Sequence, residues 1–186
     1  MVSYIIYYST TNVKGVVYKM RLKTKKIVTA ALMAAIVCVA TMIIKIPSPM
    51  KGYLNLGDCA VLLSGWMLAP GYGFFAAAVG SMLADLFSGY ALYAPATFVI
   101  KGLMALAAFY TLKLTAGRIG NFAAQLTGGV IAELIMVAGY LVFEGFLYGF
   151  VPSLVNVPAN AVQGVAGIVL GMVLVKIFEK ANITLK

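Results

Sequence analysis

The sequence predicts an all-α integral membrane protein, a bundle of six transmembrane helices with the N- and C-termini in the cytoplasm. Of its 186 residues, 63% are hydrophobic and only 10% are charged, and the mean hydropathy is +1.01. Apolar runs recur along the chain, and in lipid a helix satisfies its own backbone hydrogen bonds. Lysine and arginine gather in alternate connections, as expected when those connections lie in the cytoplasm.

Residues 1–19 are interpreted as a leader, disordered or an extended start. Their charges follow a short apolar patch instead of preceding it, which is not the layout of a signal peptide. Met20 followed by RLKTKK is a natural beginning for a membrane protein. Residues 20–186 are therefore expected to form a single six-helix membrane domain.

Six spans are expected in that domain. The first covers about 27–44 and ends before the turn-forming IPSPMKG. The second, at about 56–69, is short for a hydrocarbon core of ~30 Å, which needs roughly 20 helical residues, so it is tilted, broken or partly loop. The others are expected at about 72–88, 95–113, 119–143 and 155–178.

The basic residues set the orientation. With the N-terminus inside, six of them precede the first span: Lys14, Lys19, Arg21, Lys23, Lys25 and Lys26. The inner connections and the inner tail add Lys113, Arg118, Lys176, Lys180 and Lys186, whereas the outer connections carry only Lys45 and Lys51. This bias follows the positive-inside rule, and it makes a nucleic-acid partner a weaker explanation of the net charge of +9.

Polar residues gather in the outer half of the predicted bundle. In the fifth span, Glu133, Tyr140 and Glu144 are spaced by seven and four, and in the sixth, three amides are spaced by four and three, so each set shares one helical face. The sequence predicts an outward-facing cavity whose candidate substrate-binding residues are Asn55, Asp58, Asp85, Tyr90, Tyr93, Lys101, Glu133, Tyr140, Glu144, Asn156, Asn160 and Gln163.

Several of these residues have a structural alternative. Ionisable side chains within spans face a bundle interior or a wet pocket, so Asp85 and Lys101 either contact a ligand or form a salt bridge with each other. Asp58 is also placed to cap the second helix, and Glu144 to lie in an outer aqueous loop.

The aromatic and amide residues are similarly open to two interpretations. Tyr90 and Tyr93 belong either to an interfacial aromatic belt or to a lid that stacks on a flat heteroaromatic ligand. The amides Asn156, Asn160 and Gln163 either line a polar site, which the pattern favours, or hold helices together.

Alanine pairs mark the first span. Ala30/Ala34 and Ala31/Ala35 are small-xxx-small pairs, which let another helix approach closely. The neighbouring helix is either a partner protein or another helix of the same chain.

Other functions are disfavoured by what the sequence lacks. There are no histidines, and neither a metal cluster nor a nucleophile–base set is visible, so no metal, cofactor or enzyme activity is expected. Cys38 and Cys59 lack CxxC spacing and are interpreted as core residues. No GxxxxGK[ST] loop is present, so ATP hydrolysis would have to come from a partner.

The segments TAALMAAI (29–36), NLGD (55–58) and ADLFSGYALYAPATFVIKG (84–102) resemble the S component of energy-coupling factor (ECF) vitamin transporters, over about residues 20–180. The resemblance implies a multi-pass protein of a bacterial-type plasma membrane that captures a vitamin or precursor from outside. It implies assembly with a transmembrane coupling protein and two cytosolic ATPase subunits, and delivery of the ligand by tipping over in the membrane. It places the coupling protein on Ala31 and Ala35, with Ala30 and Ala34 as the alternative register.

The expected function is therefore high-affinity vitamin capture for an ATP-driven importer. Mixed charges, amides and tyrosines favour a pyridoxine-like or hydroxymethylpyrimidine-like ligand, and riboflavin stays open. The alternative is an autonomous secondary transporter or facilitator, coupled to protons or sodium through Glu133 or Asp85.

Overall fold

The computed structural model describes residues 2–47 and 53–181, with side chains from residue 23 onward. Its long helices are α1 (Val2–Ile43), α2 (Gly57–Met67), α3 (Pro70–Phe87), α4 (Ala94–Ile119), α5 (Asn121–Tyr148) and α7 (Val157–Lys180). Between α1 and α2, the strands β1 (Lys45–Pro47) and β2 (Tyr53–Asn55) pair antiparallel, with Ile46 opposite Leu54. A short helix α6 (Phe150–Ser153) and a 3-10 turn η1 (Leu154–Asn156) connect α5 to α7.

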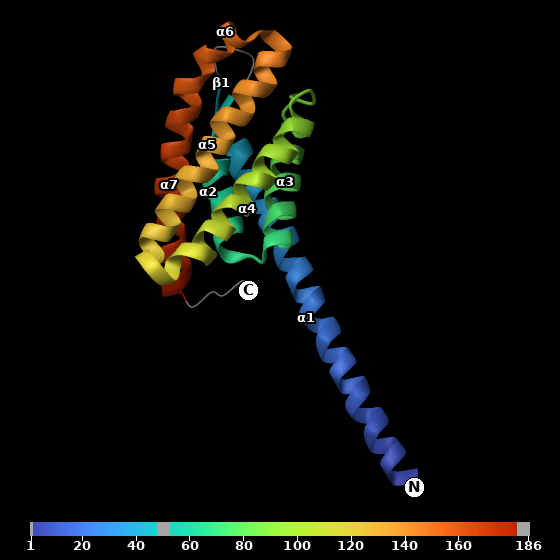
Figure 1. Ribbon diagram of the computed structural model, residues 1–186. Helices are drawn as coiled ribbons and strands as arrows, with labels where there is room; N and C mark the ends of the chain where they lie inside the picture. Colours follow the sequence, from blue (N-terminus) through green and yellow to red (C-terminus); the bar gives the residue numbers. More distant parts are fainter. Residues whose placement is uncertain (1, 48–52, 182–186) are drawn as a thin grey trace.

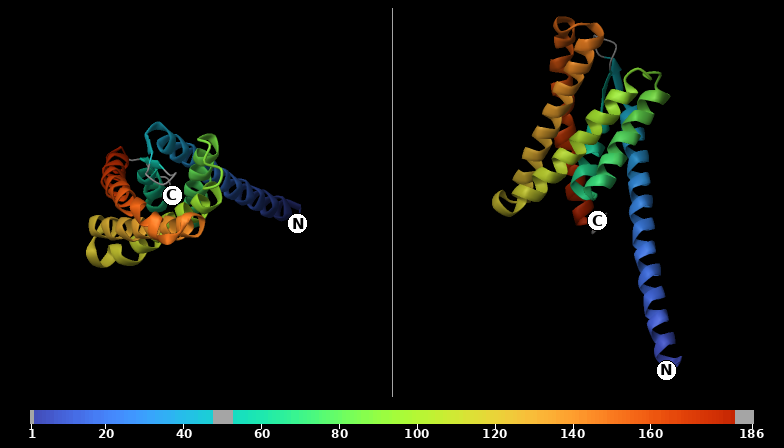
Figure 2. Two further views of the ribbon diagram at one scale, coloured as in Figure 1. Left: turned by 90° about the horizontal axis from the view of Figure 1, so that it is seen from above. Right: turned by 45° about the vertical axis from the view of Figure 1, so that its right-hand side comes forward.

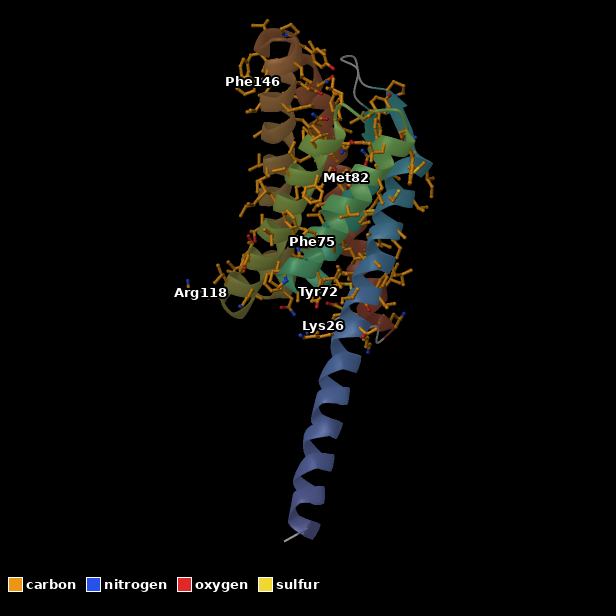
Figure 3. The ribbon with its side chains drawn as sticks, turned by 90° about the vertical axis from the view of Figure 1, so that its right-hand side faces the viewer. Lys26, Tyr72, Phe75, Met82, Arg118 and Phe146 are labelled. Carbon is orange, nitrogen blue, oxygen red and sulfur yellow. The ribbon has the colours of Figure 1, made fainter. Side chains whose placement is uncertain are left out.

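The helices lie alongside one another and give the bundle two distinct ends (Figure 1). The β1–β2 hairpin, α6 and the α3–α4 loop lie at one end, here called the hairpin end. At the other end α1 enters, α4 turns into α5, and α7 finishes (Figure 2). This second end, here called the basic end, carries Lys23, Lys25, Lys26, Lys113, Arg118, Lys176 and Lys180, of which Figure 3 labels Lys26 and Arg118.

Proline and glycine set the helix boundaries. Proline occupies the first turn of α3, α4 and α7, where its missing N–H is not needed and its fixed φ already suits a helix. Gly120 and Gly149, with φ of 80° and 93°, follow the last residues of α4 and α5. A side chain is strained in that conformation, so glycine ends each helix there. Both helices consequently run further than the predicted spans, which ended near 113 and 143.

Helix α2 forms the centre of the bundle. Every residue from Gly57 to Trp66 is buried, and α2 contacts α1, α3, α4 and α7. Its eleven residues rise only about 16 Å, roughly half the hydrocarbon thickness. A short helix is therefore present where the second span was predicted, preceded at the hairpin end by the extended strand β2, while its crossing of a membrane stays a prediction.

Four helical segments in the described part of the chain are long and apolar enough to cross a membrane: Lys23–Ile43, Ala94–Ile119, Asn121–Tyr148 and Phe150–Lys180. They coincide with the predicted first, fourth, fifth and sixth spans. Helices α2 and α3 lie where the second and third spans were predicted, but neither is among those four. A helical membrane bundle is confirmed, while the count of six spans and the cytoplasmic termini stay predictions.

Helix α1 begins at Val2 and continues without a break into the first span, so that its first half projects beyond the other helices (Figure 1). The division of the chain into a leader and a membrane domain at residue 20 stays a prediction.

Small residues allow the helices to approach closely. A Cβ built at Gly65 of α2 would lie 2.5 Å from the carbonyl oxygen of Ala105 and 2.9 Å from Cβ of Ala108, both on α4. Backbone atoms cannot move aside as a flexible side chain can. Glycine at this position therefore sets the distance between α2 and α4.

We expect Gly65→Ala to lower the thermal unfolding midpoint in detergent, measured by circular dichroism, because overpacking costs roughly 1–3 kcal/mol. The matched control is Gly117→Ala, on a part of α4 where an added Cβ has no neighbour within 4 Å. It should be neutral or stabilising, since alanine favours a helix over glycine by up to about 1 kcal/mol. Equal melting of the two variants would contradict the close contact.

Candidate functional site

A pocket opens at the hairpin end of the bundle, with a volume of about 410 Å³ including its mouth. Residues from β2, α3, the α3–α4 loop, α4, α5 and α7 line it: Tyr53, Asn55, Asp85, Tyr90, Tyr93, Thr97, Tyr140, Glu144, Asn160 and Gln163. Every lining side chain carries a polar group, and four of them are tyrosines.

Eight of the twelve predicted site residues line this pocket. The other four, Asp58, Lys101, Glu133 and Asn156, are buried behind its wall. Tyr53 and Thr97 line it but were not predicted, because Tyr53 lies in a connection without helical periodicity and Thr97 is a single hydroxyl near a helix start. The described structure thus gathers most of the predicted set at one end, and their role in substrate binding stays a proposal.

A buried ion pair lies beneath the pocket. Lys101 Nζ of α4 donates to Asp58 Oδ1 of α2, and both side chains are almost completely buried. Gln163 Nε2 of α7 donates to the other oxygen, Asp58 Oδ2, at 2.6 Å, while its Oε1 accepts from the backbone N–H of Asn55 at 2.9 Å. A buried charge is tolerated when it is paired and hydrogen-bonded, and here three helices supply the partners.

Two alternatives for the charged residues are wrong. Lys101 pairs with Asp58, not with Asp85. Asp58 does not cap α2, because its carboxylate is occupied by Lys101 and Gln163 within the bundle. The backbone N–H of Gly57 is instead satisfied by the side chain of Asn55, at 2.8 Å.

Glu144 lies inside the bundle, so its assignment to an outer aqueous loop is also wrong. The residue is only 3% exposed. Asn156 Nδ2 lies 2.9 Å from each of its oxygens, and Tyr93 Oη donates to Oε1 at 3.3 Å. The amide stripe is therefore divided: Asn160 and Gln163 line the pocket, and Asn156 positions a residue that does.

The β1–β2 hairpin is fastened across the mouth of the pocket. Tyr53 Oη donates to Asp85 Oδ1 at 2.7 Å, and Lys45 Nζ donates to Ser88 Oγ at 2.6 Å. Burial raises the pKa of the Tyr53 hydroxyl and the charge of Asp85 raises it further, so the phenol stays protonated and remains a donor. Tyr53 also contacts Tyr90, with ring centroids 4.7 Å apart.

Tyr90 and Tyr93 both lie in the pocket wall, as the lid interpretation requires. Tyr93 is only 7% exposed and packs against Phe143, with ring centroids 5.3 Å apart. A residue of an aromatic belt would instead face the lipid.

Glu133 lies deeper than the pocket, against the glycine-rich face of α7. A Cβ added at Gly164 or Gly167 would come within 3.1 Å of its carboxylate oxygens. Neither oxygen has a hydrogen-bond partner among the described residues.

The two alanine pairs of α1 point in different directions. Ala30 and Ala34 pack against the core, and a Cβ at Gly80 of α3 would collide with the carbonyl oxygen of Ala34. Ala31 and Ala35 are exposed. The Ala30/Ala34 pair therefore serves packing within the chain, and the Ala31/Ala35 pair is left for contacts outside it.

Comparison with known proteins agrees with this architecture. Residues 21–180 match the family model "ECF-type riboflavin transporter, S component". The chain belongs to this family. Members of it are integral plasma-membrane proteins of vitamin transport, and the apolar helices of this S component agree with that location.

Relatives and a solved structure resemble this S component over most of its length. A Pyrococcus woesei protein, described as an uncharacterized protein in gap 3'region, is 38% identical over 136 residues, 73% of this chain and 88% of the relative. The "Thiamine precursor transporter HmpT" of Lactococcus lactis subsp. cremoris (strain MG1363) is 31% identical over 142 residues, 74% of this chain and 76% of the relative. A solved S component of a bacterial ECF transporter matches the fold with a TM-score of 0.69 at 24% identity, over 85% of this chain and 97% of that one.

Lys101→Met should lower the free energy of unfolding by about 3–5 kcal/mol, because it leaves Asp58 charged and unpaired in the bundle interior. Adding Asp58→Asn should restore part of this loss, which a thermal-melting double-mutant cycle in detergent would measure. The control cycle pairs Lys101→Met with Asp85→Asn and should show much weaker coupling. Stronger coupling of Lys101 to Asp85 than to Asp58 would contradict the ion pair.

Proposed function

We propose that this S component captures a small heteroaromatic vitamin precursor from outside the cell and delivers it inward as the substrate-specific subunit of an ATP-driven ECF importer. The observation that carries the proposal is the tyrosine-rich polar pocket at the hairpin end, opposite the basic end of the same bundle. A hydroxymethylpyrimidine-like compound is the favoured ligand, and a pyridoxine-like compound and riboflavin are the other candidates.

The charge distribution supports an outward-facing pocket. Seven described basic residues lie at the basic end, whereas Lys45 lies at the hairpin end; Lys51 and Lys186 lie outside the described residues. Cytoplasmic flanks carry the excess of lysine and arginine. Six spans with both termini in the cytoplasm fit this arrangement, since α1 enters and α7 finishes at the basic end (Figure 1).

The pocket walls support an aromatic ligand with several polar edges. Four tyrosine rings offer stacking surfaces, and carboxylate, amide and hydroxyl groups between them offer donors and acceptors. The relative from Lactococcus lactis is a thiamine precursor transporter, which favours a pyrimidine of this type over the riboflavin in the family's name.

The energy for transport is proposed to come from partners. No nucleotide-binding loop occurs in the 186 residues. We propose that Ala31 and Ala35, on the exposed face of α1, contact the transmembrane coupling protein, which in turn connects to two cytosolic ATPase subunits. Small residues suit this role because helices in lipid associate through close packing.

Purified alone, the chain should bind its ligand tightly, and mass spectrometry of the purified protein should identify the co-purified compound. In proteoliposomes it should accumulate ligand only when the coupling protein and both ATPases are present with ATP. The matched control is the same vesicles without ATP. Uphill uptake by this chain alone, driven by a proton or sodium gradient, would favour an autonomous secondary transporter and overturn the proposal.

Replacing Ala31 and Ala35 together with leucine should abolish assembly with the coupling protein in a pull-down and leave the ligand dissociation constant nearly unchanged. The bulky side chains would block close helix approach, whereas α1 contributes no residue to the pocket lining. The control is Leu32→Ala, another exposed position on α1, which should assemble normally. Loss of ligand binding together with assembly would show that these alanines are structural.

A further inference from the structure

We infer that Asp85 is the specificity-determining acceptor of the pocket. Its free carboxylate oxygen accepts a hydrogen bond from an N–H group of the ligand. The site therefore binds an uncharged or protonated amino-substituted nitrogen heteroaromatic and rejects anionic forms such as phosphate esters. This inference rests on the proposed function and names the chemical class of its ligand.

Asp85 differs from the other buried carboxylates because it lines the pocket and also has an oxygen without a hydrogen-bond partner. Asp58 has both oxygens occupied by Lys101 and Gln163, and Glu144 has both within hydrogen-bond distance of Asn156. Glu133 has free oxygens but does not line the pocket. Among the described carboxylates, only Asp85 both lines the pocket and leaves an oxygen, Oδ2, without a hydrogen-bond partner.

The position of this oxygen is fixed by its neighbour. Tyr53 Oη holds Oδ1 of the same carboxylate at 2.7 Å, which orients the side chain. Oδ2 is buried and has no donor in hydrogen-bonding geometry; the Thr97 hydroxyl lies beside the carboxylate but is engaged with Tyr140 Oη at 3.0 Å. Asp85 is 96% buried, since only 4% of it is exposed. A buried acceptor without a donor is costly, so a ligand that supplies an N–H there makes a charge-assisted hydrogen bond, which is stronger than a neutral one.

The charge balance of the pocket points to the same ligand class. Asp85 and Glu144 line it, and none of the other lining residues is a lysine or arginine. The nearest cations are engaged elsewhere: Lys101 pairs with Asp58 beneath the wall, and Lys45, which is exposed, donates to Ser88. In a partly desolvated site this excess of negative charge repels a ligand phosphate or carboxylate and favours a neutral or protonated amino heterocycle.

A matched ligand pair separates recognition of the amino edge from general stacking. The pair is 4-amino-5-hydroxymethyl-2-methylpyrimidine and its 4-methoxy counterpart, which keeps the ring but carries no N–H, with the phosphate ester of the amino compound as a third ligand. By titration calorimetry in detergent, the unaltered protein should bind the amino compound at least tenfold more tightly than the 4-methoxy compound or the ester. This comparison does not depend on any variant folding.

The decisive variant is Asp85→Asn, which keeps an acceptor for Tyr53 and presents an NH₂ donor in place of Oδ2. We expect at least tenfold weaker binding of the amino compound and unchanged or tighter binding of the 4-methoxy compound, so the preference for the amino compound narrows or inverts. The control Tyr53→Phe removes the contact to Oδ1 and should weaken both ligands by a similar factor.

Three results would overturn the inference. If Asp85→Asn weakens both pyrimidines equally and keeps the preference, Asp85 is structural, and the proposed function stands. If the unaltered protein prefers the 4-methoxy compound or the ester, the ligand class is wrong while vitamin capture stands. If it binds no heteroaromatic vitamin or precursor at all, both the inference and the proposed function fail.

Discussion

The buried pair of Lys101 and Asp58 ties the pocket to the bundle. A lysine and an aspartate inside a membrane bundle are each costly alone, and they become tolerable only when α4 and α2 place them in contact. Gln163 adds α7 to this pair, and through the Asn55 backbone it also fixes strand β2. The floor of the pocket is thus held by groups that cannot separate without leaving a charge unpaired in the interior.

Helix α2 lies at the centre of the bundle, where Asp58 reaches its partners on α4 and α7. Its eleven residues are too few to cross a bilayer, and they are buried on all sides by α1, α3, α4 and α7. Glycines hold this packing close: Gly65 faces α4, while Gly167 and Gly171 of α7 face Asp58 and Trp66. A side chain at Gly167 would meet Asp58 Cβ at 2.8 Å, so the close approach of α7 is what brings Gln163 within reach of the ion pair.

The sequence was sufficient to predict the membrane class, the short second helix and the end of the bundle where polar residues gather, because hydropathy and helical periodicity are local properties. It could not predict which charges pair. Asp85 and Lys101 are sixteen residues apart, and a salt bridge between them was one of two alternatives because charges near the membrane interface tolerate pairing. The partner of Lys101 is Asp58, forty-three residues away, a choice set by how α4 crosses α2. Tyr53 was missed for a similar reason, since a three-residue strand has no periodicity that would assign it a face.

The two faces of α1 separate the pocket proposed to bind ligand from the surface proposed to contact a partner. Ala30 and Ala34 are committed to the bundle because the α1 backbone at Ala34 lies against Gly80 of α3, where a larger residue would not fit. Because this face of α1 packs inside the bundle, Ala31 and Ala35 face outward, and no side chain of α1 lines the pocket. The chain nevertheless passes from α1 into β1 and on to β2, which carries Tyr53 and Asn55 to the pocket mouth. The hairpin therefore connects α1 covalently to the pocket, and its hydrogen bonds from Lys45 to Ser88 and from Tyr53 to Asp85 link the end of α1 to the end of α3.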